Sequence, residues 1–384
     1  SGPRSVMTDT PVIVAAVRTP QGKEDGAFAG VRSEDLSVPL IDEILDRTGL
    51  TGEQVDDLLW GCAQQRDEQG NNLARVIALL SDLGEATPGS TLNRWCASSA
   101  EAIMRGRDAI AAGQRDCVIA GGVESMSRVE MGANMGSVHP GLAEAYHVAA
   151  LQLGMPAETV AERPHISRAE QDSYAALSQQ RAAAATESGR FAEEIVPVET
   201  ESGTVETDEG IRPDTTAEKL AGLSPVFKSD GTVTAGNASQ ISDGASATLL
   251  TSRSFATDHG LDVLAEVGNH SVAGVDPTVM GVGPVPAVRQ LCDRYDRDTD
   301  DYDLVELNEA FASQTLYCRR ELGFTEEMFN VNGGAIALGH PLGASGARLP
   351  VTLVHEMNHR DADLGLATEC VGFGQGAAME FHLP

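Results

Sequence analysis

Short apolar runs alternate with amphipathic segments along most of the chain. Residues 11–17 form a β-branched run that predicts a buried strand, and residues 36–50 carry apolar positions at helical spacing with Gly49 as a stop signal. The strand pattern returns at 55–61 and the helical pattern at 99–112. Strands that alternate with helices in this way predict a layered α/β domain.

The pattern changes after the strand predicted at 116–120, which we expect to end at Gly121 and Gly122. Met, Gly and Pro interrupt residues 126–164, and an Ala-rich helix is predicted over 168–186. We interpret this stretch as an insertion rather than as a further α/β repeat.

After residue 242 the first pattern returns. A strand-like run at 303–307, a Gly-rich turn and helix at 333–358, and a strand at 365–370 follow in the order seen in the first part of the chain. The similarity of order predicts two halves with one topology.

Composition and charge narrow the class of protein. The chain has 384 residues, of which 41% are hydrophobic, so it can bury a large core and is not disordered. Acidic residues number 57 against 27 basic ones, the net charge is −30, and the acids are dispersed along the chain. Such a surface repels nucleic acids and anionic membranes, so we expect neither as a partner.

Only three of the 27 basic residues are lysines. Dispersed acidity with almost no lysine favours a halophilic protein, because concentrated salt screens the self-repulsion of the acids. The alternative is an ordinary acidic protein from an Arg-rich, high-GC genome.

No apolar run reaches the about 18 residues that cross a bilayer, and the apolar run 12–17 is too short for a signal peptide. We therefore expect a soluble, cytoplasmic protein. Its six cysteines show no CxxC pair and no zinc-type Cys/His spacing, which favours free thiols and no metal site.

Cys96 is the candidate nucleophile. It lies in NRWCASS at the start of the helix predicted at 99–112, where the positive end of the helix dipole favours a thiolate. The alternative is a buried structural cysteine. That interpretation better suits the four thiols within apolar strand or helix patterns: Cys62, Cys117, Cys292 and Cys318.

His340 and Cys370 both lie among glycines. The glycines around His340 let the backbone approach a ligand closely, so His340 is a candidate base. Cys370 is followed by VGFGQG, which fails as a dinucleotide-binding loop because too few residues remain for a helix and a second strand. Glycines beside a thiol instead suggest backbone N–H groups that face a developing oxyanion.

Six motifs, in this order along the chain, resemble those of the thiolases: NRWCASS, GGVESMSRVEMG, DGTVTAGNASQISDGASA, LNEAFASQ, NGGAIALGHPLGASGAR and CVGFGQGAAM. The resemblance implies an α/β fold with a five-layer αβαβα core of two similar βαβαβαββ halves. It divides the chain into an N-terminal half at 8–125 plus 243–262, an inserted loop domain at 126–242 and a C-terminal half at 263–384. The loop domain would contribute to coenzyme A binding and oligomer contacts.

The resemblance also implies a role for each matching position. Cys96 would take the acyl group as a thioester, with His340 accepting the thiol proton. Cys370 would act as acid or base at the α-carbon of acetyl-CoA. Asn308 would hold a water that binds the enolate oxygen together with His340, and the N–H groups of Cys96 and Gly372 would form a second oxyanion hole.

Coenzyme A is strongly anionic, so a chain of this charge needs local basic groups to bind it. Arg212, Lys219 and Lys228 are candidates because they place two of the three lysines within 17 residues, and ordinary surface charge is the alternative. The resemblance adds Ser239, at the position that bonds the pantetheine arm, and Phe311 as a further substrate-site residue.

Chain-length preference depends on two segments. Leu153 matches a position that contacts the acyl end, and Gln152 replaces the His that biosynthetic acetoacetyl enzymes usually carry, which favours a pocket for more than four carbons. Phe373, where many relatives have a small residue, argues for a narrower pocket.

The implied reaction is reversible Claisen chemistry, in which 3-oxoacyl-CoA and CoA give acyl-CoA and acetyl-CoA. Coenzyme A is a substrate, and no metal or redox cofactor is implied. The segments LNEAFASQTLYCRRELG and ISRAEQDSYAALSQQRAAAA are closer to degradative 3-ketoacyl-CoA thiolases. The alternative is a biosynthetic acetoacetyl-CoA thiolase, an acetyl-CoA C-acetyltransferase.

Two further classes are disfavoured. A ketoacyl synthase would need a histidine in place of Cys370, and a catalytically silent lipid-carrier or scaffold subunit would be expected to have lost one of the four catalytic positions. All four are present. We expect a homodimer or a tetramer of two dimers, and the sequence leaves an accessory subunit open.

Overall fold

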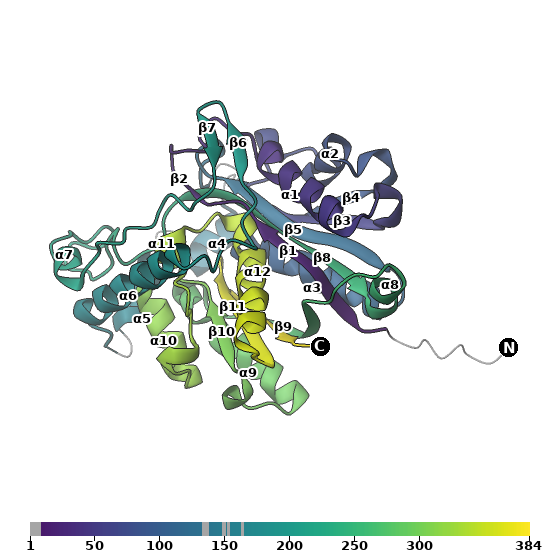
Figure 1. The fold of residues 1–384 in the computed structure, drawn as a ribbon. Helices are drawn as coiled ribbons and strands as arrows, with labels where there is room; N and C mark the ends of the chain where they lie inside the picture. Colours follow the sequence, from purple (N-terminus) through teal and green to yellow (C-terminus); the bar gives the residue numbers. More distant parts are fainter. Residues whose placement is uncertain (1–8, 133–137, 148–150, 152–153, 163–164) are drawn as a thin grey trace.

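The computed structural model describes residues 9–132, 138–147, 151, 154–162 and 165–384 (Figure 1). Its core is one mixed sheet with the strand order β10-β11-β12-β9-β1-β8-β5-β3-β4, to which β2 adds at β8. The strands are β1 (Pro11–Arg18), β2 (Gly22–Lys23), β3 (Asp57–Gly61), β4 (Gly89–Leu92), β5 (Cys117–Ser125), β8 (Ser242–Ser252), β9 (Ala265–Gly274), β10 (Leu304–Leu307), β11 (Leu364–Val371) and β12 (Gln375–His382).

The sheet repeats its own topology on either side of the short junction between β1 and β9. The order β3-β5-β8-β1 in one half corresponds to β10-β11-β12-β9 in the other. The pairs β3–β5 and β10–β11 are parallel, and the remaining pairs within these two orders are antiparallel. The edge strand β4 adds to β3 in parallel. The counterpart of β4 is reduced to a single parallel bridge between Val305 and Phe329. The two expected halves of one topology are therefore confirmed.

Helices cover both faces of each half of the sheet (Figure 1). The central pair, α3 and α12, pack against each other, and α12 contacts β5 and β8 of one half together with β10 and β11 of the other. On the outside, α1 packs on β1 and β8, and α9 packs on β9 and β12. The main helices are α1 (Ser33–Thr48), α2 (Leu73–Leu80), α3 (Ser98–Ala111), α9 (Pro284–Tyr295), α10 (Ala312–Leu322) and α12 (Leu342–Arg360).

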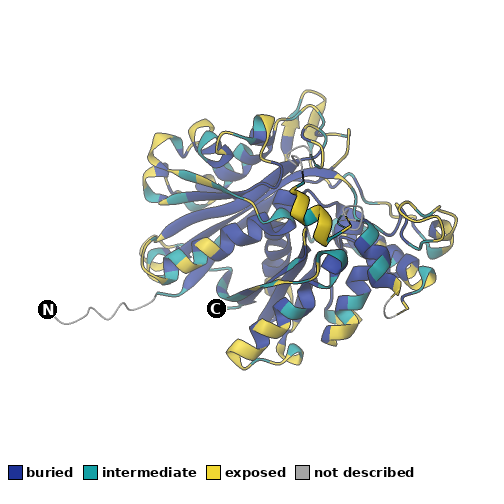
Figure 2. Ribbon diagram, turned by 180° about the vertical axis from the view of Figure 1, so that it is seen from behind, coloured by how far each residue is buried: buried dark blue, intermediate teal, exposed yellow. Residues whose placement is uncertain are grey.

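This arrangement gives the expected five αβαβα layers. Figure 2 shows that buried residues follow the sheet, whereas exposed residues gather on the peripheral helices and loops. Every residue of α12 from Leu342 to Met357 is buried, because the helix lies between the two halves. Among the described helices, none combines the length and the apolar character needed to span a membrane.

The two glycines expected to close a strand at residue 120 lie inside β5 instead. A Cβ at Gly121 would lie 2.1 Å from the carbonyl oxygen of Ser246, and one at Gly122 would lie 2.1 Å from that of Gly343. These glycines therefore mark close backbone approaches within the sheet and to α12, and not a turn. The sequence prediction was wrong because it had no view of these tertiary neighbours.

The inserted region adds helices beside the second half of the sheet. The predicted Ala-rich helix is confirmed as α6 (Arg168–Glu187), which begins at a Ser167/Glu170 capping box. Residues 198–205 form a hairpin of β6 (Val198–Thr200) and β7 (Gly203–Val205). The smaller helices of this region are α4 (Pro140–Ala145), α5 (Gly154–Glu162) and α7 (Ala217–Ala221). Two further short helices, α8 (Arg253–Asp258) and α11 (Ala335–Leu338), lie outside it.

Candidate active site

Cys96 lies in the 3₁₀ turn η4 (Trp95–Ala97) that leads into α3. Trp95 adopts a left-handed backbone conformation with φ of 45°, so the chain turns sharply before the thiol. The hydroxyl of Ser98 donates to the Trp95 carbonyl at 2.6 Å and fixes this turn. The Cys96 side chain is buried in one cluster with Leu342, the second residue after His340, and the turn η4 contacts α12. The starts of the two central helices therefore meet at this thiol.

The second thiol comes from the other half of the sheet. Cys370 lies near the end of β11, is fully buried, and is close enough to Cys96 that a charge on one thiol raises the pKa of the other. The chain then continues through Gly372, whose backbone N–H donates to the Cys96 thiol. The structure thus brings Cys96, Cys370 and Gly372 together from segments about 275 residues apart in the sequence.

His340 stands directly before α12 and is buried. Its Nδ1 lies 2.5 Å from the hydroxyl oxygen of Ser345, and that hydroxyl lies 3.0 Å from the carbonyl oxygen of Pro341, to which it donates. Because the Ser345 proton is used in that bond, Nδ1 carries the ring proton and donates to Ser345. The Nε2 atom of His340 is then left unprotonated and can accept a proton.

Asn308 follows β10 and faces the same histidine. Its side-chain nitrogen lies 3.4 Å from Nε2 of His340, and its backbone N–H donates to the Thr368 carbonyl of β11 at 3.0 Å. Gln314 donates to the Asn308 carbonyl at 3.2 Å and completes its anchoring. The Oδ1 atom is buried and has no hydrogen-bond partner among the described residues, so it offers an acceptor to a ligand.

Burial keeps both the Cys96 thiol and the His340 imidazole neutral. It raises the pKa of Cys96 to about 12, against the opposing effect of the Gly372 N–H. Burial, helped by the positive charge of Arg348, lowers the pKa of His340 to about 4. The structure therefore favours a neutral thiol at Cys96 and not the thiolate expected from the helix start, because burial disfavours the charged form.

An apolar wall surrounds Cys370. Phe311 belongs to the same buried cluster, and its ring lies edge-on to that of Phe227 with 6.1 Å between centroids. The other members of the cluster are Ala157, Val233, Met280 and Ala310. Phe373 lies outside this cluster, and its ring is 36% exposed and tilted against that of Trp95. Leu153 and Gln152, on which we based the expected acyl pocket, lie outside the described residues.

The candidate coenzyme A residues are more dispersed. Lys219 binds Asp214 at 2.7 Å, and Lys228 binds Glu162 at 2.6 Å, so both lysines already have acidic partners. Arg212 is exposed, and its guanidinium makes no ion pair or hydrogen bond with the residues described here. Ser239 is half-buried, and its backbone N–H donates to Ala310 at 2.9 Å, which places it beside Phe311.

Sequence reasoning missed Glu309, the residue after Asn308. Its carboxylate accepts hydrogen bonds from Tyr174 at 2.5 Å and Ser178 at 2.6 Å, both on α6, and from the N–H of Ile336 at 3.2 Å. It therefore holds the Gly-rich segment before His340 against the inserted region. Its place beside Asn308 in the LNEAFASQ motif was the only available signal.

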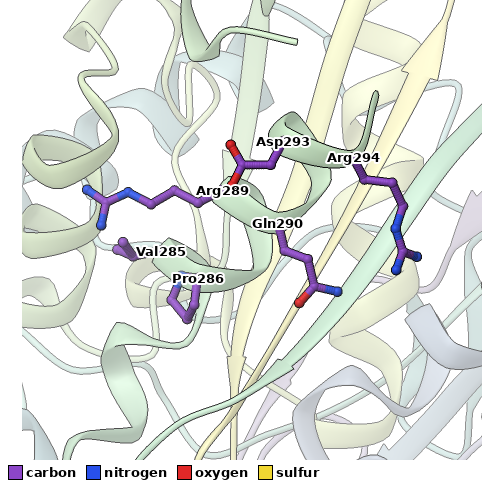
Figure 3. Close-up of a pocket in the computed structure, with 6 residues that line it drawn as sticks. All are labelled: Val285, Pro286, Arg289, Gln290, Asp293 and Arg294. Carbon is purple, nitrogen blue, oxygen red and sulfur yellow. The ribbon is translucent and has the colours of Figure 1, made fainter. Parts of the chain in front are cut away.

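A pocket of about 580 Å³ on the outer layer is separate from this site. Figure 3 shows its lining residues, which all lie on α9. They are Val285, Pro286, Arg289, Gln290, Asp293 and Arg294. None of them is a predicted site residue, and none contacts the two cysteines in the buried clusters described above.

Comparison with protein families agrees with this geometry. The family model "Thiolase, N-terminal domain" matches residues 11–254, and "Thiolase, C-terminal domain" matches residues 261–382. Together they cover nearly the whole chain, including each of the four residues that meet at the site. The chain belongs to the thiolase family.

Individual relatives refine the comparison. The chain is 47% identical over 382 residues to a 3-ketoacyl-CoA thiolase of Pectobacterium carotovorum, covering 97% of this chain and 98% of that one. It superposes on human mitochondrial 3-ketoacyl-CoA thiolase in complex with CoA with a TM-score of 0.91 at 38% identity, covering 98% and 99% of the two chains. An acetyl-CoA acetyltransferase of Bacillus anthracis gives a TM-score of 0.89 at 39% identity, with the same coverage.

Proposed function

We propose that this thiolase is a 3-ketoacyl-CoA thiolase, which uses CoA to cleave 3-oxoacyl-CoA into acyl-CoA and acetyl-CoA. The observation that carries the proposal is the meeting of two buried thiols, Cys96 and Cys370, beside the starts of both central helices. Full-length identity of 47% to a 3-ketoacyl-CoA thiolase supports the degradative substrate class.

In the first step, the Cys96 sulfur attacks the 3-oxo carbon while His340 takes its proton at Nε2. The neutral imidazole suits this role, because its lowered pKa of about 4 leaves it unprotonated at neutral pH. The bond between C2 and C3 then breaks, and its electron pair forms the enolate of acetyl-CoA. Cys370 donates its proton to C2, so the products of this step are acyl-Cys96 and acetyl-CoA.

In the second step, the CoA thiol gives its proton to the Cys370 thiolate and attacks the acyl-Cys96 carbonyl. Cys96 leaves as a thiolate and recovers its proton from His340, which restores the starting state. We assign the N–H groups of Cys96 and Gly372 to the acyl-carbonyl oxygen, and Asn308 with His340 to the enolate oxygen. The unpaired Oδ1 of Asn308 supports this, since it can hold a bridging water.

Acetyl labelling tests the nucleophile. Incubation with acetyl-CoA should add one acetyl group to the peptide that contains Cys96, and Cys96→Ser should lose both the label and turnover. Cys318→Ser is the matched control, because Cys318 is also a buried thiol but its sulfur donates to the Gly281 carbonyl at 3.3 Å. Labelling of Cys370 or Cys318 in the parent protein would disprove the assignment.

Acyl chain length separates the degradative enzyme from the biosynthetic alternative. The Phe373 ring leans on Trp95 and lies outside the apolar cluster around Cys370, which supports the wider pocket. Each buried methylene contributes about 0.8 kcal/mol, so thiolysis should become about tenfold more efficient over two added carbons where they are buried. A rate confined to acetoacetyl-CoA, with none on 3-oxohexanoyl-CoA, would favour the acetyltransferase.

We also propose a cytoplasmic homodimer. Leu79 and Leu80 are 50% and 58% exposed on α2, which packs against the edge strand β4. Unpaired edge strands and adjacent exposed leucines favour association. Sedimentation should therefore show a dimer or larger assembly, and Leu80→Glu should shift it toward the monomer. The control is Leu223→Glu, which changes a leucine that is 39% exposed elsewhere.

A further inference from the structure

Two loops from different halves of the molecule present the N–H groups of Cys96 and Gly372. One loop precedes α3, and the other joins β11 to β12. No sheet pairing links these loops directly, because β3 and β4 of the first half are far from β11 in the strand order. The turn before α3 packs on β11 and α12, and side-chain contacts between the two loops add to this packing.

The first contact is a chain of hydrogen bonds. The guanidinium of Arg94 donates to the side-chain oxygen of Gln375 at 3.1 Å, and the Gln375 amide nitrogen donates to the Gly372 carbonyl at 3.2 Å. Arg94 is itself fixed on α3 by Glu101 at 2.8 Å. The chain therefore runs from the helix behind Cys96 to the peptide that follows the Gly372 N–H.

The second contact is aromatic. Trp95 and Phe373 flank Cys96 and Gly372 in sequence, and their rings lie 5.5 Å apart with 31° between planes. Both adopt left-handed backbone conformations, with φ of 45° and 60°, which is unusual for bulky residues. A Cβ at Gly372 would come within 3.3 Å of the Trp95 ring, so the ring lies directly on this glycine.

We propose that Arg94 and Gln375, together with the Trp95–Phe373 ring contact, form a clamp that sets the position of the Gly372 N–H relative to Cys96. Arg94 and Gln375 are positioning residues, since each acts through the Gly372 peptide. The inference rests on the proposed function where it assigns this N–H to the acyl-carbonyl oxygen. It has a separate structural basis in the hydrogen bond from Gly372 to the Cys96 thiol.

Steady-state thiolysis by Arg94→Ala, Gln375→Ala and the double variant tests the clamp. Each single variant should lose about tenfold in kcat with KM changed by less than about twofold, because a misplaced oxyanion donor acts in the transition state. The double variant should be no slower than the slower single variant, since both break one chain. Multiplied losses, or unchanged kcat, would overturn the proposal.

Arg105→Ala is the matched control. Arg105 binds the other oxygen of Glu101 at 2.9 Å, but within the described residues it makes no hydrogen bond to Gln375. The Arg105→Ala variant should therefore keep the parent kcat. Any loss that it does show measures the effect of disturbing Glu101 alone. A kcat as low as that of Arg94→Ala would assign the loss to Glu101 and contradict the clamp.

Gln375→Glu tests whether Gln375 acts by holding the Gly372 peptide or only by binding Arg94. A carboxylate still accepts the Arg94 hydrogen bond, but it cannot donate to the Gly372 carbonyl. We expect this variant to be as slow as Gln375→Ala. Full rescue would show that the bond to Gly372 is not used, and would overturn the proposal.

Alkylation of Cys96 by iodoacetamide tests the clamp without relying on thiolase activity. Displacing the Gly372 N–H removes a donor that lowers the thiol pKa, so both alanine variants should alkylate several-fold more slowly at a given pH than Arg105→Ala. Identical rate profiles would overturn the clamp. Absence of thiolysis in the parent protein would instead overturn the proposed function. The alkylation rates would still test the clamp in that case.

Discussion

At the scale of single residues, Cys96 and Cys370 rest as neutral thiols and not as thiolates. Burial raises the pKa of both Cys96 and Cys370, and the proximity of the two thiols raises that of Cys370 further. His340 is held neutral by the same burial. Proton transfer from Cys96 to His340 therefore belongs to the reaction itself, when the oxyanion donors stabilise the developing charge.

The pH dependence of thiolysis follows from the His340 pKa. The ordinary histidine pKa of about 6.5 is lowered to about 4, so His340 stays an unprotonated base as the pH falls through 6.5. We expect kcat/KM to keep its plateau down to about pH 5, with the loss from His340 protonation below that. A kcat/KM profile from pH 5 to 8 checks this, and an acid limb near 6.5 would contradict it.

Substitution of Cys370 should separate the two chemical steps. Cys370→Ser should lower thiolysis by about 10³-fold or more, because a hydroxyl is a poor acid and base near neutral pH. Acetyl transfer from acetyl-CoA to Cys96 should survive in part, while deuterium exchange at the acetyl methyl group should stop. Equal losses of label and exchange would show that acyl transfer needs Cys370 as much as proton transfer at the α-carbon does, and would contradict the expected separation.

At the scale of elements, the two central helices meet through small residues. Gly346 of α12 lies against Ala100 of α3, and a Cβ at Gly346 would be 2.5 Å from the Ala100 nitrogen. This close approach lets Cys96 and His340, at the starts of the two helices, share one site. Larger residues here would separate the helices and the catalytic groups together.

Gly346→Ala tests this contact. Alanine normally favours a helix interior, but the steric conflict with Ala100 should lower the free energy of unfolding by about 1–3 kcal/mol. Gly274→Ala is the control, because a Cβ there would meet nothing within 4 Å. Denaturant unfolding measures both variants. A stability of Gly346→Ala equal to that of the parent would show that the helices have room to separate.

At the scale of the whole molecule, the net charge of −30 dominates. Two of the three lysines are already paired with acidic residues, so they offset little of the repulsion elsewhere. Exposed residues lie mainly at the periphery, where solvent ions can screen them (Figure 2). We therefore expect the stability of the fold to depend on salt concentration.

Lowering KCl from about 2 M to about 0.1 M should reduce both the melting temperature and thiolysis. At about 0.1 M the Debye length is about 10 Å, which leaves repulsion between neighbouring acids largely unscreened. Thermal melts and rates across this series measure the effect, with sucrose as a control for non-ionic stabilisation. A melting temperature independent of KCl would favour the acidic protein of a high-GC genome.

The sequence by itself predicted the alternation of strands and helices and the two similar halves, and it singled out Cys96, His340 and Cys370, with Asn308 added by the family resemblance. Apolar runs predict five of the ten strands of the main sheet, because these strands lie almost wholly inside, and an Ala-rich composition predicts α6. Cys96, His340 and Cys370 stand out because each lies in a local pattern with glycines or a helix start. Such signals are local, so they need no knowledge of neighbours.

Only the tertiary structure decided how these residues behave. The direction of the Cys96 pKa depends on burial by distant segments, and the place of Gly121 inside β5 depends on the neighbouring strand. The contacts from Arg94 to Gln375, about 280 residues apart, are likewise invisible in any local pattern. Desolvation and close packing are properties of the assembled layers, which is why chain order alone cannot give them.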